Sequence, residues 1–427
     1  MIIARSIQRI AATAGKRAPR FAASLSLSAT PTAVSISGVG LFSYRWLRDS
    51  CQCPSCVHPS TRQKLHASSD IPRNIKPVEP ATVQAGSLSL RWPGHANPSV
   101  YERAFLEAYA TAAGTSAVHG DGHLMQAGWK ANQLAEKPSL FIDYDALKDD
   151  PVQRLVAFEH LAQTGLLLVK GVPNKQTSDE SCELRKLASV FGEIRRTFYG
   201  RTWDVVAKKG STNIAYTSLY LGLHMDLEYV YRDFSGHSVS DLAYRYFAHP
   251  PRYQILHCLR NRVTGGTSLF VDALSAAESL RIRHPDAFSL LASYPIPFHY
   301  RNDGHHLHHA HRTIELDPAS GAITQLNYSP PFQAPLPAGT PDDVYDALKL
   351  FADTLDEEGR LFSYLLREGD AAVFDNRRVL HARDAFVDPK EDEEDDGEPM
   401  RWLKGCYVEA DPLLDRARML RKNLGTV

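Results

Sequence analysis

From about residue 166 to the C-terminus, short apolar segments alternate with turns that are rich in Gly, Pro, Asn and Asp. The segments YQILHC, TSLFVDAL, AAVFD and KGCYVEA are examples. Many short strands joined by such turns favour a barrel or a double-sheet jelly roll, because both architectures limit the number of unpaired strand edges. We therefore predict a mainly β fold, a double-stranded β-helix (jelly roll), for residues 138–427. Beyond residue 166, helical patterns occur only as insertions at 276–293 and 342–358, and at the C-terminal end.

A histidine and an aspartate lie two positions apart in the apolar segment YLGLHMDLEYV, at His224 and Asp226. In a strand, residues i and i+2 face the same side, so the imidazole and the carboxylate can converge on one point. A third candidate is His381, which lies near the end of the apolar strand in FDNRRVLHARDAF. Two imidazoles and one carboxylate form a facial triad that binds Fe(II) and leaves positions for a cosubstrate and O2. The alternatives are core histidines and a His-x-Asp pair that arises by chance.

Arg401 lies twenty residues beyond His381, in the strand-like segment PMRWLKGCYVEAD. A dicarboxylate cosubstrate beside the iron requires a buried guanidinium that binds its distal carboxylate through two hydrogen bonds. Arg401 is the candidate for this role. The alternative is an arginine at a strand edge that forms a surface ion pair.

Five motifs occur in a fixed order along the chain: YGRTWDVV, TNIAYTSLYLGLHMD, RVTGGTSLFVDAL, FDNRRVLHARDAF and RWLKGCYVEAD. From about residue 40 to the C-terminus, the chain resembles the gamma-butyrobetaine dioxygenase and trimethyllysine dioxygenase family of Fe(II)/2-oxoglutarate oxygenases. The resemblance implies that iron is bound by His224, Asp226 and His381. It also implies that Arg401 binds 2-oxoglutarate, that O2 is the co-reactant with ascorbate as reductant, and that a homodimer forms through the C-terminal helix.

Substrates of this family carry a trimethylammonium group, which has no N–H and is held by the faces of aromatic rings. The resemblance places an aromatic cage at Tyr199, Trp203, Tyr216 and Tyr407. Asn213 favours one of two substrates, because its neutral amide can donate a hydrogen bond to the carboxylate of gamma-butyrobetaine. Trimethyllysine would present an α-ammonium group, which prefers an acidic residue. The alternatives are core aromatic residues and a turn asparagine that bonds to its own backbone.

The predicted activity is hydroxylation of gamma-butyrobetaine at C3 to L-carnitine, coupled to oxidative decarboxylation of 2-oxoglutarate to succinate and CO2. One alternative within the same chemistry is trimethyllysine hydroxylation. A histone-lysine demethylase is disfavoured, because the chain has no basic tail or reader-like repeats. An alternative of another class is a catalytically silent metal-binding scaffold. This alternative stays open because residues 227–246, which directly follow Asp226, are longer than the family pattern and could cover or disrupt the site.

Three of the six cysteines lie within six positions, whereas the other three are scattered. The clustered residues are Cys51, Cys53 and Cys56. This distribution predicts a metal site in a reducing compartment rather than a disulfide framework. The resemblance implies His95 as the fourth ligand of a closed, structural zinc site, and three thiolates with one imidazole suit tetrahedral Zn²⁺. His58 and His66 are rivals on sequence alone, and free buried cysteines are the alternative to a metal site.

Strand-like segments flank the cysteine cluster, so residues 38–110 are predicted to form a small zinc-binding β module, followed by a linker at 111–137. Two further segments are predicted to be solvated loops. The acidic segment 388–398 contains eight acidic residues and lengthens the connection between two strands, which a loop tolerates. The segment HHLHHAH at 305–311 has histidines too dense for one chelate geometry.

The first acidic residue of the chain is Asp49, and the segment before residue 37 is rich in Arg, Ala and Ser. An amphipathic, acid-free start of this composition is typical of a mitochondrial transit peptide. We therefore predict a transit peptide at residues 1–37 and a location in the mitochondrial matrix; the alternative is a tail without an address on a cytoplasmic protein. A net charge of -1 and a pI near 7.0 give no reason to expect a nucleic acid or an anionic membrane as a partner.

Overall fold

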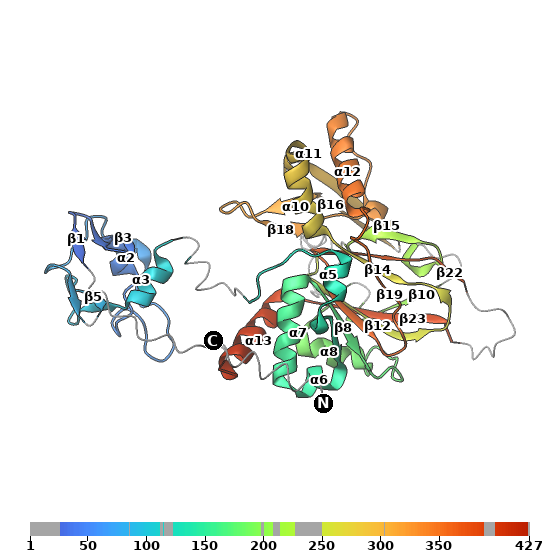
Figure 1. Ribbon diagram of the computed structural model, residues 1–427, viewed down its shortest axis with the longest axis horizontal. Coiled ribbons are helices and arrows are strands. Elements are labelled where there is room, and N and C mark those ends of the chain that lie inside the picture. Colours follow the sequence, from blue (N-terminus) through green and yellow to red (C-terminus); the bar gives the residue numbers. More distant parts are fainter. Residues whose placement is uncertain are drawn as a thin grey trace. The chain divides into compact units, whose positions relative to one another are not determined.

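The computed structural model describes residues 26–84, 86–111, 114, 123–197, 200–207, 214–226, 250–302, 304–387 and 398–425. The chain forms two compact units, Met1–Gly122 and His123–Val427 (Figure 1). Each unit has its own hydrophobic core, and the two are described separately. No helix within the described ranges is long and apolar enough to span a membrane.

The described part of the N-terminal unit contains two small antiparallel sheets and two short α-helices. The first sheet has the order β1-β2-β3 and the second has the order β4-β5-β6. The elements are β1 (Leu27–Ala29), β2 (Ala33–Ile36), β3 (Gly40–Ser43), α2 (Tyr44–Asp49), β4 (Thr82–Gln84), β5 (Ser87–Leu90), β6 (Ser99–Tyr101) and α3 (Arg103–Tyr109). Alternate strand residues such as Leu88 and Leu90 are buried with Trp92 and Leu106, which gives a small core.

The expected start of the fold after residue 37 is wrong. Residues 27–36 form β1 and β2, and Val34 and Ile36 are 0% and 1% exposed in the core of this unit. Because β2 pairs with both β1 and β3, a cut after residue 37 would remove two of the three strands of the sheet. The Arg-rich part of the predicted transit peptide, up to residue 25, lies outside the described residues.

The C-terminal unit is built on two packed sheets that are antiparallel except for the parallel pair β7 and β8, which confirms the predicted jelly roll with added helices. The seven-stranded sheet contains β10 (Trp203–Val206), β23 (Arg401–Val408), β12 (Tyr253–Asn261), β20 (Ala371–Asp375), β8 (Leu166–Lys170) and β7 (Phe141–Asp143), with β9 (Ile194–Arg195) paired to β23. The four-stranded sheet contains β11 (Leu221–His224), β21 (Val379–Arg383), β14 (Ser268–Asp272) and β19 (Phe362–Tyr364). Apolar side chains from both sheets, including Phe270 and Phe374 with ring centroids 5.6 Å apart, pack between them.

Helices cover the outer face of the large sheet. They are α6 (Tyr144–Asp149), α7 (Pro151–Thr164), α8 (Glu183–Phe191) and α13 (Ala410–Asn423) (Figure 1). Phe158 of α7, Leu187 of α8 and Leu413 of α13 are completely buried against β12, β20 and β23. Because side chains alternate across a strand, the side chains on the opposite face of this sheet point away from the helices. Some of them, such as Leu256 and Leu403, line a cavity.

A second set of elements is inserted between β14 and β19 and has its own core. The elements are α10 (Ala273–Arg283), α11 (Pro285–Leu291), β15 (Pro295–Asn302), β16 (His305–Arg312), β17 (Ile314–Leu316), β18 (Ile323–Leu326) and α12 (Asp342–Leu355). The predicted loop at 305–311 is wrong, because this segment lies in β16 and pairs with β15. His306 and His308 are exposed, whereas His311, on the opposite side of the strand, is only 7% exposed.

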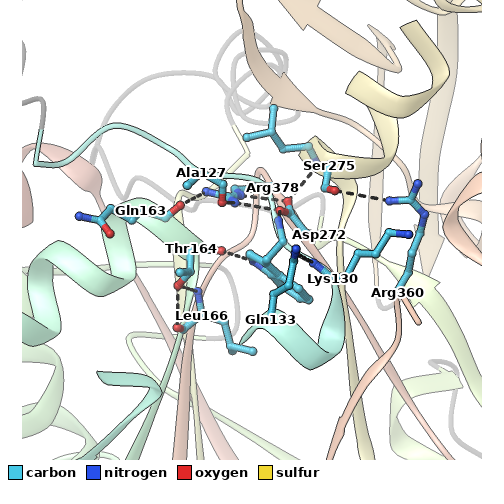
Figure 2. A network of polar contacts seen from close by, with 12 residues as sticks. Ala127, Lys130, Gln133, Gln163, Thr164, Leu166, Asp272, Ser275, Arg360 and Arg378 are labelled. Carbon is cyan, nitrogen blue, oxygen red and sulfur yellow. Dashed lines mark hydrogen bonds and ion pairs between the residues drawn. The ribbon is translucent and has the colours of Figure 1, made fainter. Parts of the chain in front are cut away.

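Part of the expected linker at 111–137 belongs to the larger unit. Trp129 is 2% exposed, and its backbone N–H donates to Asp272 Oδ2 at 2.9 Å. Figure 2 shows that the Asp272 carboxylate also forms an ion pair with the guanidinium of Arg378, whose Nη2 lies 2.8 Å from Oδ2. Arg378 Nη1 and Nη2 also donate to the carbonyls of Gln163 and Ala127. Because Asp272 ends β14 and Arg378 directly precedes β21, this buried ion pair fixes the two central strands of the smaller sheet.

Candidate functional site

Two strands bring the predicted iron ligands together. His224 at the end of β11 lies directly opposite His381 on β21, and the ring centroids are 4.2 Å apart. Asp226 Oδ1 lies 3.6 Å from His224 Nε2 and 4.0 Å from His381 Nε2. One ligand atom from each residue falls within 4.8 Å of the others. Neighbouring ligands of a six-coordinate divalent ion stand about 3 Å apart, so small side-chain movements would complete a metal site.

Both imidazoles are positioned for metal binding. His224 Nδ1 donates to the carbonyl oxygen of Gly222 at 2.8 Å, which orients the ring so that Nε2 faces the other two ligands. His381 is 8% exposed, and burial together with the neighbouring His224 lowers its pKa to about 3. Its imidazole is therefore neutral at pH 7. The donor set of two imidazoles and one carboxylate fits Fe(II).

Asp226 is held by two residues from distant parts of the chain, Asn376 in the turn after β20 and Tyr407 on β23. The side-chain amide of Asn376 accepts from the Asp226 backbone N–H and donates to its carbonyl oxygen, both at 2.8 Å. The Tyr407 hydroxyl donates to Asp226 Oδ2 at 2.5 Å. Oδ1 therefore remains directed at the imidazoles. Sequence reasoning missed Asn376; its only signal is an amide directly after an apolar strand, five residues before His381.

The triad opens into a cavity of about 110 Å³ between the two sheets. Its aromatic wall includes Trp203, Tyr216 and Tyr407. The rings of Trp203 and Tyr407 stack with centroids 4.2 Å apart and an interplanar angle of 22°. A Cβ atom on Gly405 would lie 2.6 Å from the Trp203 ring, so only glycine at this position allows the stack. Two further members of the predicted substrate site, Tyr199 and Asn213, lie outside the described residues.

Arg401 lines the same cavity and is only 5% exposed. Its Nη2 lies 3.4 Å from the carbonyl oxygen of Gly266, and its Nε has no hydrogen-bond partner. Its burial, and the lack of a carboxylate ion pair among the described residues, disfavour the alternative of a surface ion pair. Burial and the nearby Arg383 lower the pKa of Arg401 to about 10. A buried guanidinium without an anion fits the distal carboxylate of a dicarboxylate cosubstrate.

The three clustered cysteines also converge, in the N-terminal unit. The thiols of Cys51, Cys53 and Cys56 lie within 4.8 Å of one another. His95 Nδ1 lies 3.9 Å from the sulfur atoms of both Cys53 and Cys56. Burial and the neighbouring Cys53 raise the pKa of Cys56 to about 12, although Arg48 Nη1 donates a hydrogen bond to the Cys56 sulfur at 3.3 Å. The donor set fits Zn²⁺, which deprotonates its thiol ligands on binding.

The two rival histidines lie differently. The exposed His58 accepts a hydrogen bond from the backbone of Thr61 through Nδ1 at 3.2 Å. His66 Nε2 lies 3.5 Å from Asp49 Oδ1. No hydrogen bond to a cysteine sulfur is formed by either residue in the described part of the chain. The geometry therefore favours His95 as the fourth ligand.

Together, a jelly roll and a two-histidine, one-carboxylate triad that opens beside a buried arginine define a non-haem iron oxygenase site. Residues 133–407 match the Taurine catabolism dioxygenase TauD, TfdA family. Residues 39–107 match the Gamma-butyrobetaine hydroxylase-like, N-terminal family. The chain therefore belongs to the TauD/TfdA family of Fe(II)/2-oxoglutarate-dependent dioxygenases.

Three relatives show the breadth of this similarity. Dioxygenase str8 of Strobilurus tenacellus is 47% identical over 89% of this chain and 85% of its own length. Gamma-butyrobetaine dioxygenase of Pseudomonas sp. (strain AK-1) is 33% identical over 90% of this chain and 91% of its own. Trimethyllysine dioxygenase, mitochondrial, of Rattus norvegicus is 28% identical over 90% of this chain and 84% of its own. The similarity therefore extends over both units.

Proposed function

We propose that this protein hydroxylates gamma-butyrobetaine at C3, giving L-carnitine, with 2-oxoglutarate converted to succinate and CO2. The observation that carries the proposal is one cavity that joins the triad, the buried Arg401 and an aromatic wall. The relative named gamma-butyrobetaine dioxygenase at 33% identity supports the same substrate. Trimethyllysine is the second candidate, supported by the relative of that name at 28% identity.

Fe(II) with 2-oxoglutarate and O2 supplies the oxidising chemistry. The chain's own residues bind and orient the reactants. His224, Asp226 and His381 hold the metal, and Tyr407 and Asn376 keep the Asp226 carboxylate in position. Arg401 binds the distal carboxylate of 2-oxoglutarate. Apolar residues such as Leu256 and Phe270 line the cavity and exclude water, which strengthens each charge interaction inside it.

The aromatic wall supports a substrate that carries a trimethylammonium group. The π faces of Trp203, Tyr216 and Tyr407 attract a cation that cannot donate a hydrogen bond. Asp226 is the only carboxylate among the described lining residues, so a cation here depends on aromatic rings. We propose that Tyr199 completes this cage and that Asn213 donates to the carboxylate of gamma-butyrobetaine, which favours it over trimethyllysine.

We further propose a structural zinc ion bound by Cys51, Cys53, Cys56 and His95. The N-terminal unit has a small core, and a closed tetrahedral site would add the stability that such a core lacks. The mitochondrial matrix is the proposed location, supported by the acid-free N-terminus and by a relative whose name includes "mitochondrial". A homodimer through α13 is the proposed assembly.

A turnover assay tests the proposed function. The full chain is incubated with Fe(II), ascorbate, O2 and 2-oxoglutarate, with gamma-butyrobetaine in one arm and trimethyllysine in the other. We expect succinate and L-carnitine in equal amounts with gamma-butyrobetaine, and no product with the His381→Ala variant. Hydroxylation of trimethyllysine alone would overturn the substrate assignment. Iron binding without succinate formation in either arm would favour a silent scaffold.

A further inference from the structure

The described part of the cavity contains a second buried arginine, Arg383, that the family assignment leaves without a role. It lies on β21, two positions beyond His381, so both side chains are on the same side of the strand. Arg383 is 6% exposed and lines the cavity with Arg401. No carboxylate within the described residues forms an ion pair with it, and burial lowers its pKa. Its charge is therefore compensated in another way.

Backbone carbonyls compensate the charge of Arg383. Its Nη1 donates to the carbonyl oxygen of Ala215 at 3.1 Å, and Nη2 donates to those of Thr217 at 2.7 Å and Leu219 at 2.5 Å. The guanidinium carbon also lies 5.0 Å from the centroid of the Phe386 ring. A planar guanidinium can donate to three carbonyls that face it from one segment, whereas a lysine ammonium is a point charge without this geometry.

The bonded segment, residues 215–219, carries one wall of the cavity. It contains Tyr216 at the end of a short 3₁₀ helix, η3 (Ile214–Tyr216), and leads directly into β11. Leu221, the first residue of β11, pairs with Arg383 itself, and the last residue is the iron ligand His224. The strand that carries His381 therefore holds the segment that carries Tyr216.

We propose that Arg383 is a positioning residue that fixes segment 215–219 against the metal-binding strand, so that Tyr216 is in place before substrate binds. The three hydrogen bonds connect the aromatic wall to the triad through one side chain. Substrate is then held at a constant distance from the metal, which is the requirement for coupling 2-oxoglutarate turnover to hydroxylation. The expected change in KM for gamma-butyrobetaine rests on the proposed function, whereas the expected change in amide hydrogen exchange does not.

Arg383→Lys keeps the charge and removes the fork of hydrogen bonds. In the full chain, we expect amide hydrogen exchange in peptides that cover residues 214–221 to become faster by roughly tenfold or more, the factor for one lost charge-assisted hydrogen bond. With Fe(II) and 2-oxoglutarate, we expect KM for gamma-butyrobetaine to rise by about tenfold, KM for 2-oxoglutarate to stay within about threefold, and more succinate per hydroxylated product. The matched control is Arg360→Lys, a buried arginine that bonds to Glu357 and Ser275 outside the cavity.

The outcomes separate this proposal from the proposed function. Unchanged exchange at 214–221 in Arg383→Lys would overturn the positioning role, whatever the substrate. An equal acceleration of exchange in Arg360→Lys would also overturn it, because the effect would then be general destabilisation. A rise in KM for 2-oxoglutarate alone would assign Arg383 to the cosubstrate instead. If wild-type protein does not hydroxylate gamma-butyrobetaine, the proposed function fails, and the exchange result still decides the role of Arg383.

Discussion

The two ligand clusters of this chain differ in what surrounds them. In the N-terminal unit, three thiols converge, His95 lies 3.9 Å from two of them, and Cys51 and Cys56 are 1% and 0% exposed. In the C-terminal unit, only three ligands converge, and they form part of the wall of a cavity. A closed set of four ligands suits a structural metal, whereas an open set of three leaves coordination positions for reactants. The number of protein ligands and the space beside them therefore distinguish a stabilising site from a reactive one.

The largest expected effect tests the closed cluster. Cys56→Ser should remove zinc and unfold the N-terminal unit, because structural zinc binding contributes about 10 kcal/mol or more to the folding of a small domain. Zinc content by mass spectrometry should fall from one ion per chain to none, and limited proteolysis should cleave residues 26–111. Cys182→Ser is the control, a buried cysteine of the larger unit. Equal zinc content in both variants would contradict the assignment.

His381→Ala tests the open cluster and should abolish chemistry with little change in stability. Loss of one of three protein ligands removes the bound metal, and we expect 2-oxoglutarate turnover to fall by roughly a thousandfold or more, about 4 kcal/mol. Succinate formation and the melting temperature are measured together. His160→Ala, a buried histidine bonded to Ser139, should lower stability and keep turnover. If turnover fell in proportion to the melting temperature in both variants, the loss would reflect stability, and His381 would have no separate role in the chemistry.

Arg401→Gln tests whether the open cluster has a cosubstrate-binding group beside it, which the closed cluster lacks. The amide keeps some hydrogen bonding and loses the charge, so we expect Kd for 2-oxoglutarate to rise by about a hundredfold. The Kd for Fe(II) should change little, as Arg401 is not a ligand. Titration calorimetry with each ligand measures both values. An unchanged Kd for 2-oxoglutarate would mean that another residue binds its distal carboxylate.

The smallest expected effect concerns the hydrogen bond from Tyr407 to Asp226. Tyr407→Phe keeps the ring stacked on Trp203 and removes the hydroxyl, so we expect iron affinity to fall by roughly tenfold, the usual effect of losing a partner of a metal ligand. The Kd for Fe(II) is measured at fixed pH. Tyr253→Phe, on the opposite face of the neighbouring strand β12, is the control. An equal change in both variants would mean that the effect is not specific to the carboxylate.

Sequence reasoning worked where a spacing implies a geometry. The two-residue spacing of His224 and Asp226, and the strand-like surroundings of His381 and Arg401, predicted residues that the structure brings to one cavity. It failed where packing between distant segments decides. The strands β1 and β2 lie in the acid-free N-terminal segment that suggested a leader, and only pairing with β3 shows that they belong to the fold. Segment 305–311 is rich in histidine, and its pairing with β15 overrides that composition.

The sequence by itself determined the type of each side chain at the two clusters and the order of the strands that carry them. These properties depend on residue identity and on local periodicity, which a single chain contains in full. Only the tertiary structure decided which groups support the ligands: the Asn376 amide, the Gly405 contact under Trp203, and the hydrogen bonds from Arg383 to segment 215–219. Each of these joins residues far apart in the sequence, and such contacts depend on register and packing rather than on the neighbouring sequence.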